Sequence, residues 1–327
     1  MGIAFLDHPA PLAFAHRGGA AHAPENSWRA FEHAVGLGYG YVETDVQATA
    51  DGVLVAFHDR TLTRVTGHPG RVSRVSHREL EALRIEGSEP IPRLEDLLGA
   101  WPGIRFNIDV KDAPAIGPLA EVLRRTGAWD RVCLCSFSSS RLRATRRALD
   151  REVCMAASPL GAAVVRLGGP RGPRDSHGPS RTKATVRLRR RAGARSHPPS
   201  LTRPSAQLPD LARRHQPASA AAITAAGMAP AAAASPAAGP PPALSPRRLS
   251  DWLDRTGVRC LQLPASVVTR ALIARTHSLG LQVHAWTIND RRTMEHLLDL
   301  GVDGIMTDET VLLRNVLTHR NLWHPSR

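Results

Sequence analysis

Short apolar runs alternate with amphipathic helical stretches along most of this chain, and this order is the feature that most restricts its fold. Parallel strands need long crossover connections, usually helices, so repeated strand–helix units predict a parallel sheet covered by helices. The expected strands are Leu12–Ala15, Tyr41–Val46, Arg105–Val110, Val132–Phe137, Glu152–Ala157, Val258–Leu263, Gln282–Ile288 and Gly304–Thr307. The expected helices between them include Ser27–Leu37, Ile116–Thr126, Ser139–Leu149, Ser266–Leu279 and Arg291–Leu300.

Eight strand–helix units in about 250 residues match the size of a (β/α)₈ barrel. The predicted fold class is therefore α/β, a TIM barrel, with a further strand pair inserted from Gly52 after the second strand. A doubly wound open sheet is the alternative, but no Gly-rich dinucleotide fingerprint follows the first strand.

One segment, Gly169–Arg248, does not share this pattern. It holds 14 of the 26 prolines, and 14 Lys and Arg against two acids, so only +2 of the net charge of +14 belongs to the rest of the chain. It contains no Phe, Trp, Tyr or Glu. Such a composition buries too little apolar surface to offset the entropy of ordering it, so we expect it to be disordered or poorly packed.

Two interpretations of this segment remain open. Arg171–Arg214 could bind nucleic acid or another acidic partner, although the segment has no aromatic residue for base stacking. Its Arg/Pro/Ala/Ser/His bias is also what GC-rich coding DNA gives when read out of frame, and we favour this hypothesis. One uninterrupted frame on resequencing, with a matching tryptic peptide, would exclude it. We expect a single domain over residues 10–315, interrupted at 169–248 between the fifth and sixth strands, and a C-terminal tail over 316–327.

Neither a membrane span nor a secretory signal is evident. The chain has no apolar run of about 18 residues, and Met1–Pro11 lacks the basic start and cleavage site of a signal peptide. A cytoplasmic protein is therefore expected. The four cysteines are too few for a disulfide framework, and we interpret Cys133, Cys135, Cys154 and Cys260 as packed free thiols on strands.

Polar residues gather where the predicted strands end. They are His16, Arg17, Glu43, Asp45, His58, Asp109 and Lys111. Side chains two apart on a strand share a side, so Glu43 pairs with Asp45, and Asp109 with Lys111. The carboxyl ends of barrel strands meet on one face, which predicts a single cluster.

The residue types in this cluster indicate phosphoryl-ester chemistry. Three neighbouring carboxylates are costly unless a cation neutralises them, and hard oxygen ligands suit Mg²⁺ or Ca²⁺. Arginine and lysine suit a phosphate group, and histidines suit proton transfer. Each feature alone has an ordinary explanation, such as a structural histidine, a solvated strand edge or a surface ion pair. The inference rests on their combination.

The motifs His-Arg-Gly, Pro-Glu-Asn, Glu-x-Asp and Asp-Gly-x₅-His-Asp occur in order within AFAHRGGAAHAPENSWRAFEHAVGLGYGYVETDVQATADGVLVAFHD. This stretch resembles the opening of glycerophosphodiester phosphodiesterases, and FNIDVK, VHAWTIND and LLDLGVDGIMTD are similar to that family's later strands. The resemblance covers roughly residues 10–167 and 250–315. It implies a TIM barrel of the phospholipase-C-like phosphodiesterase type.

The resemblance also implies roles for individual residues. His16 and His58 would be the general acid–base pair, with the role of each left open. The third metal ligand is often Glu in such enzymes, whereas this chain has Asp109. Asn26, next to Glu25, would orient neighbouring groups, and Trp286 would form an apolar wall against glycerol, unless it is ordinary core. The divalent ion (Mg²⁺ or Ca²⁺) would be held by Glu43, Asp45 and Asp109, and the phosphate by Arg17 and Lys111.

The expected function is metal-dependent hydrolysis of glycerophosphodiesters to sn-glycerol 3-phosphate and an alcohol, in glycerol and lipid metabolism. One alternative is a related diesterase that acts on a lysophospholipid or sphingomyelin. The other is a nucleic-acid or acidic-partner binding protein that acts through its basic segment and has a degenerate barrel.

Overall fold

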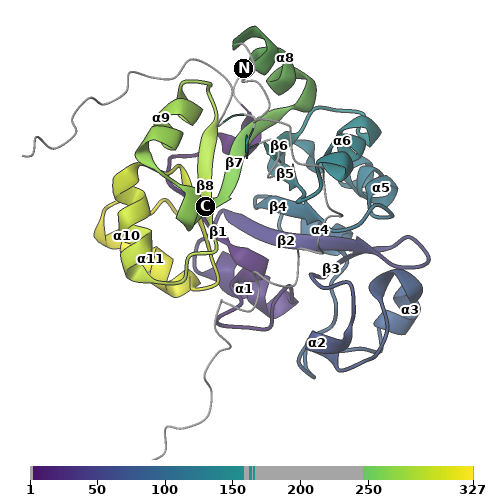
Figure 1. The fold of residues 1–327 in the computed structure, drawn as a ribbon. Coiled ribbons are helices and arrows are strands. Elements are labelled where there is room, and N and C mark those ends of the chain that lie inside the picture. Colours follow the sequence, from purple (N-terminus) through teal and green to yellow (C-terminus); the bar gives the residue numbers. More distant parts are fainter. Residues whose placement is uncertain (1–2, 158–161, 164, 166–245, 327) are drawn as a thin grey trace, which may run out of the picture. The chain divides into compact units, whose positions relative to one another are not determined.

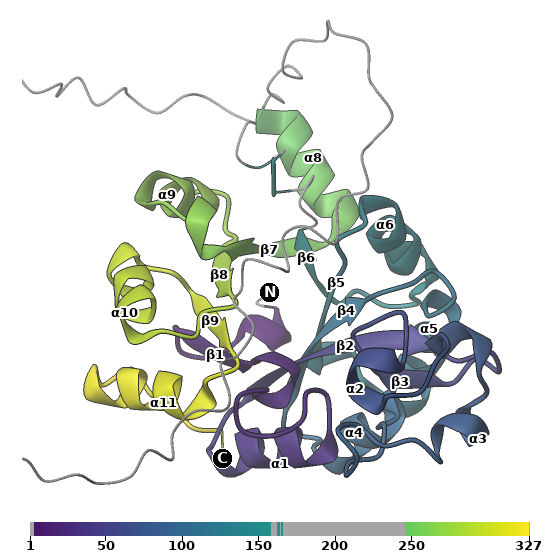
Figure 2. The ribbon, with the colours of Figure 1, turned by 60° about the horizontal axis from the view of Figure 1, so that its bottom comes forward.

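A closed ring of parallel strands forms the centre of the protein (Figures 1 and 2). The computed structural model describes residues 3–157, 162–163, 165 and 246–326. The strands are β1 Leu12–Ala15, β2 Tyr41–Ala48, β3 Leu54–Ala56, β4 Arg105–Val110, β5 Val132–Cys135, β6 Cys154–Ala157, β7 Val258–Pro264, β8 Gln282–Trp286 and β9 Gly304–Thr307. Apart from β3, each strand pairs in parallel with both neighbours, and β1 closes the ring by pairing with β2 and β9. The predicted (β/α)₈ barrel is confirmed.

Helices surround this ring (Figure 2). The α-helices are α1 Trp28–Gly36, α2 Thr63–Thr66, α3 His77–Leu80, α4 Leu94–Ala100, α5 Ile116–Thr126, α6 Ser139–Ala148, α8 Pro246–Thr256, α9 Arg270–His277, α10 Arg291–Leu300 and α11 Thr310–His319. The 3-10 turns are η1 Ala4–Leu6, η2 His16–Gly18, η3 Val72–Arg74, η4 Ala128–Arg131 and η6 Ala265–Val267.

The expected helices are present with small shifts at their ends. Ser27 lies before α1 and accepts a hydrogen bond from the Ala30 amide, which explains why that helix begins at Trp28. The helix expected over Ser266–Leu279 begins only at Arg270, because Thr269 is its N-cap and accepts from the Leu272 amide. Helix α11 runs through the expected domain end at residue 315.

Side chains alternate between the inside of the ring and the layer under the helices. Val42, Ile108 and Leu134 belong to a buried cluster that includes many helix residues. Phe14 and Tyr41 belong to a second cluster that takes only strand residues and the N-terminal turn, which places it inside the barrel. The interior is therefore packed near the amino ends of the strands, and polar groups occupy the carboxyl ends.

The inserted strand pair is present as β3, which runs antiparallel to β2. With α2, α3 and η3 it forms a small lobe that has its own buried cluster around Val55, Phe57 and Leu80. In Figure 1 this lobe projects beside β2 and β4. His58 follows Phe57 directly, so the lobe fixes the position of that histidine.

The unusual segment falls in the connection between β6 and β7. These two strands pair directly in parallel, so the ring is continuous across the connection. Residues 166–245, with most of the predicted interruption, lie outside the described residues. Pro246 already begins α8, so the regular fold resumes slightly before Arg248. Within the described ranges, no helix is both long and apolar enough to cross a membrane.

Candidate active site

Two histidines face the carboxyl end of the barrel, and each is held by a carboxylate through Nδ1. His16 follows β1, and its Nδ1 lies 2.7 Å from Oδ1 of Asp308, the residue after β9. His58 Nδ1 lies 2.7 Å from Asp59 Oδ1. A carboxylate accepts, so each Nδ1 carries the proton and each Nε2 is left to exchange protons.

The surroundings shift the two histidines in opposite directions. Burial favours neutral His16, but the charge of Glu43, 3.8 Å from Nε2, and the bond to Asp308 outweigh it and raise its pKa. Burial dominates at His58, whose pKa is lowered although Asp45 and Asp59 act the other way. The surroundings therefore separate the two imidazoles, with the pKa of His16 above its ordinary value and that of His58 below it.

Arg17 adopts a left-handed backbone conformation that turns it into the site. Its φ is 50°, and its amide donates to Glu43 Oε2 over 3.0 Å. Gly18 follows with φ +83°, and a Cβ there would lie 2.8 Å from the Ala30 Cβ, so the turn needs glycine to pack against α1. The Arg17 guanidinium contacts Glu25 at 3.1 Å and Asp45 at 3.3 Å.

Asp45 is the most heavily paired acid of the site. Lys111 Nζ lies 2.7 Å from its Oδ1, and Asn26 donates to its Oδ2 over 3.0 Å. Asn26 is itself fixed because Thr44 donates to its Oδ1 over 2.8 Å. Burial alone would raise the pKa of Asp45, but Lys111 and Arg17 hold it well below its usual range. Asp45 is thus ionised throughout the physiological range.

Glu43 and Asp109 are buried with less compensation. Burial and the neighbouring Asp45 raise the pKa of Glu43 to about 7. Burial also raises the pKa of Asp109, although Lys111 Nζ lies 2.7 Å from its Oδ2. Asp109 Oδ1 is buried and has no hydrogen-bond partner. These acceptors fit a hard divalent cation, which would satisfy the free oxygen and favour ionised Glu43.

The three carboxylates do not yet form a compact ligand set. Lys111 lies between Asp45 and Asp109 and contacts both. Among the described residues, the ligand atoms that converge within 4.8 Å belong to three cysteines and not to these acids. Any cation held by Glu43, Asp45 and Asp109 would therefore draw their oxygens closer together.

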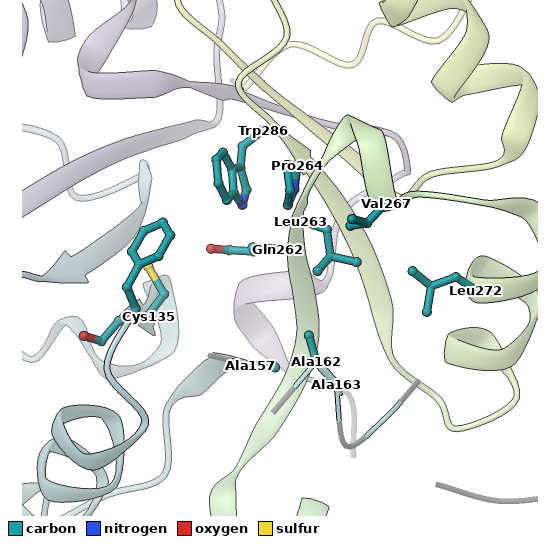
Figure 3. Close-up of a pocket in the computed structure, with 12 residues that line it drawn as sticks. Cys135, Ala157, Ala162, Ala163, Gln262, Leu263, Pro264, Val267, Leu272 and Trp286 are labelled. Carbon is teal, nitrogen blue, oxygen red and sulfur yellow. The ribbon is translucent and has the colours of Figure 1, made fainter. Parts of the chain in front are cut away.

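An apolar cavity of about 310 Å³ lies between strand ends, lined by residues such as Gln262, Leu263 and Trp286 (Figure 3). Trp286 at the end of β8 lines it, and its ring lies 5.7 Å from the ring of Phe137, which is 62% exposed. Lys111 Nζ lies 5.7 Å from the Phe137 ring centre. Trp286 is half-buried, and it both lines this cavity and packs against the inner barrel cluster.

Several residues of the site carried no predicted role. Asp308 holds His16, and Asn289 in turn donates to Asp308 Oδ2 over 2.7 Å. Arg64 in α2 bonds Asp59 over 2.6 Å and Glu25 over 2.6 Å, so it links the carboxylate behind His58 to the one beside Arg17. The signal for Asp308 was its place directly after a strand, the same signal that identified the other groups.

Asp308→Asn is expected to lower the pKa of His16, because the variant removes a carboxylate that stabilises the imidazolium form. NMR titration of the protein labelled at its histidine rings measures this directly. The matched control is Glu309→Gln, which neutralises the next residue and should leave the titration of His16 unchanged. An unaltered His16 titration in Asp308→Asn would remove Asp308 from this role.

Comparison with known proteins identifies the family of this barrel. The model of the "Glycerophosphoryl diester phosphodiesterase family" matches residues 16–159 and 212–312. A Mycobacterium tuberculosis protein named "Probable glycerophosphodiester phosphodiesterase 2" is 33% identical, and the match covers 98% of this chain and 96% of that one. A human lysophospholipase D is 36% identical over 109 residues, which are 29% of this chain and 35% of that one.

A solved structure shows the same fold. An Oleispira antarctica phosphodiesterase, in complex with the product sn-glycerol-3-phosphate, superposes with a TM-score of 0.62 at 19% identity, over 94% of this chain and 97% of that one. The family match extends over both parts of the barrel and includes the strand ends that carry the histidines and carboxylates. The chain belongs to the glycerophosphoryl diester phosphodiesterase family and is a phosphoric diester hydrolase.

Proposed function

We propose that this protein hydrolyses glycerophosphodiesters to sn-glycerol 3-phosphate and an alcohol, with His58 as general base and His16 as general acid. The observation that carries the proposal is the pair of Nδ1-anchored histidines on either side of the Glu43, Asp45 and Asp109 carboxylates. Family membership supports the substrate class, and the Oleispira antarctica protein binds the corresponding product.

Proton transfer would follow from the opposite pKa shifts. His58, whose pKa is lowered, would accept a proton at Nε2 from the nucleophile, either water or the glycerol 2-hydroxyl. His16, whose pKa is raised, would donate from Nε2 to the departing alkoxide. Asp308 and Asp59 would hold the two rings in place during these transfers.

The charged groups would bind and orient the phosphate. Arg17 and Lys111 present half-buried cations that would attract a phosphodiester and stabilise the charge that develops on its oxygens. When bound by Glu43, Asp45 and Asp109, a divalent cation, Mg²⁺ or Ca²⁺, would supply further positive charge at the same place. Trp286 would exclude water on the side of the glycerol part.

We also propose that the domain extends over residues 10–315 around the interruption at 169–248. The pairing of β6 with β7 supports a single barrel that tolerates this connection. Acidic-partner binding through Arg171–Arg214 concerns residues outside the described ranges, and the lysophospholipid alternative is left to substrate comparison.

Release of glycerol 3-phosphate from glycerophosphoethanolamine tests the proposed function. Purified protein is expected to release it with Mg²⁺ or Ca²⁺ and to lose activity in EDTA, because the buried carboxylates then lack their counter-ion. The His16→Ala variant is the negative control for this assay. The assay is repeated on a variant with residues 169–245 replaced by a short linker, and lysophosphatidylethanolamine serves as a competing substrate. If the full chain and the linker variant are both folded and neither releases glycerol 3-phosphate, the proposal is refuted.

A further inference from the structure

Three cysteines from different strands converge inside the barrel, below the site described above. They are Cys133 on β5, Cys154 on β6 and Cys260 on β7. Their sulfur atoms all lie within 4.8 Å of one another, and Cys133 Sγ is 4.0 Å from Cys260 Sγ. In the sequence only Cys133 and Cys135 are near neighbours, so the barrel closure and strand register create this cluster.

We propose that Cys133, Cys154 and Cys260 form a binding site for one thiophilic metal ion, Zn²⁺, which is separate from the carboxylate site of the hydrolase. Zn²⁺ binds thiolates at about 2.3 Å, and a tetrahedral arrangement then places the sulfurs roughly 3.8 Å apart. The Cys133–Cys260 Sγ distance of 4.0 Å is close to this value, and the other two Sγ distances are no more than 4.8 Å. A soft sulfur set also favours Zn²⁺ over the hard cations that suit the carboxylates.

His284 is the candidate for a fourth ligand, and its ring would have to move toward the cysteines to bind, because its nitrogens are not in the group of atoms that lie within 4.8 Å of one another. It is fully buried on β8, and its Nε2 lies 3.0 Å from Gln282 Oε1. The amide oxygen accepts, so the proton is on Nε2 and Nδ1 carries a free lone pair. Nδ1 is buried and has no hydrogen-bond partner. His284 lies on β8, which pairs with the β7 strand that carries Cys260, and three cysteines with one histidine are a common structural zinc set.

A cavity reaches one member of the cluster, Cys154. A cavity of about 690 Å³ opens at the amino ends of the strands, and Cys154, Arg259 and Gln282 are among its lining residues. An ion would therefore reach Cys154 first, from the face opposite the hydrolase site, and local opening of the strand ends would admit it to Cys133 and Cys260. Each thiol would give up its proton to solvent on binding. Three thiolates with Zn²⁺ leave one negative charge, which Arg259, an electrostatic neighbour of Cys154, partly offsets.

Cobalt binding tests this site independently of catalysis. The reduced, metal-stripped full chain is titrated with Co²⁺ under nitrogen, with excess Mg²⁺ present for the carboxylates. We expect about one equivalent to give thiolate-to-cobalt charge-transfer absorption and the intense visible bands of a tetrahedral site. Zn²⁺ should then abolish both. Oxygen ligands give no charge-transfer band of this kind, so the two sites are distinguishable.

Matched variants show whether the cluster is responsible. Cys154→Ser and Cys260→Ala should lose the charge-transfer band, whereas Cys135→Ala, which removes the thiol outside the cluster, should keep it. Replacing His284 with Asn should weaken Co²⁺ binding without removing the band. Zn²⁺ should also raise the Tm of the wild type and of Cys135→Ala by several degrees, but not that of the other two cysteine variants.

The proposal is overturned if folded wild-type protein gives no charge-transfer band, or if the band persists in Cys154→Ser and Cys260→Ala. Either result would make the three residues ordinary packed thiols. Circular dichroism on every variant confirms that loss of the band does not reflect loss of the fold. The outcome is independent of the hydrolase assay, because the readout needs no substrate.

Discussion

His16→Ala and His58→Ala are each expected to lower kcat by about 10²–10⁴-fold, the usual effect of removing a general acid or base. The Nδ1 of each ring is bound to a carboxylate 2.7 Å away, so Nε2 is the only nitrogen free to exchange a proton. Steady-state release of glycerol 3-phosphate measures the effect. His277→Ala is the matched control: its Nε2 also lies 2.7 Å from a carboxylate, that of Asp303, but it is outside the site.

An activated leaving group separates the two roles. A p-nitrophenyl diester of glycerol 3-phosphate releases an anion that needs little protonation. His16→Ala should therefore recover most of its rate on this substrate, because a general acid is no longer required. His58→Ala should stay slow, since the nucleophile must still be deprotonated. The opposite pattern would exchange the two roles, and near wild-type rates in either variant would remove that histidine from the mechanism.

Lys111→Met is expected to reduce the free energy of unfolding by roughly 3–5 kcal/mol when no divalent cation is present. The Lys111 ammonium contacts Asp45 and Asp109, both at 2.7 Å. Its removal therefore leaves two buried carboxylates without the positive charge of this ion pair. Denaturant unfolding in EDTA measures the loss. Arg124→Met is the matched control, because Arg124 also contacts two acids, Glu121 and Asp150, but at the surface, where the loss should be small.

Adding Mg²⁺ or Ca²⁺ should restore much of the stability of Lys111→Met. The freed oxygens of Asp45 and Asp109 would then bind the cation together with Glu43, and binding to the folded state alone stabilises it. Turnover should stay low, because a phosphate-binding cation is missing. If divalent ions leave the unfolding midpoint of this variant unchanged, these carboxylates do not hold the metal.

Much of the fold and of the candidate site was predictable because barrel geometry turns sequence spacing into position. Glu43 and Asp45, two apart on β2, do point to the same side, and register pairs Asp45 with Asp109 on β4. Strand ends were less accurate. The fourth strand is predicted to end at Phe137, whereas β5 ends at Cys135. The Phe137 ring is therefore exposed, next to Trp286.

Other features depend on contacts that no local pattern encodes. Asp308 follows a strand like several other acids, and only the closing of β9 onto β1 brings it to His16. Arg64 meets Glu25 across 39 residues of sequence because α2 folds back over the site. The interpretation of the four cysteines as unrelated packed thiols did not foresee that three of them converge, since that depends on the register of three strands.

Because Asp308 follows the last strand, its contact with His16 can form only after nearly the whole chain has been synthesised. Every other charged group proposed to act in hydrolysis lies within the first 111 residues, so a ribosome has produced them long before the barrel can close. The carboxylate that orients His16 arrives only with the last strand. A nascent or truncated chain would thus carry nearly all of its reactive side chains and still be a poor catalyst.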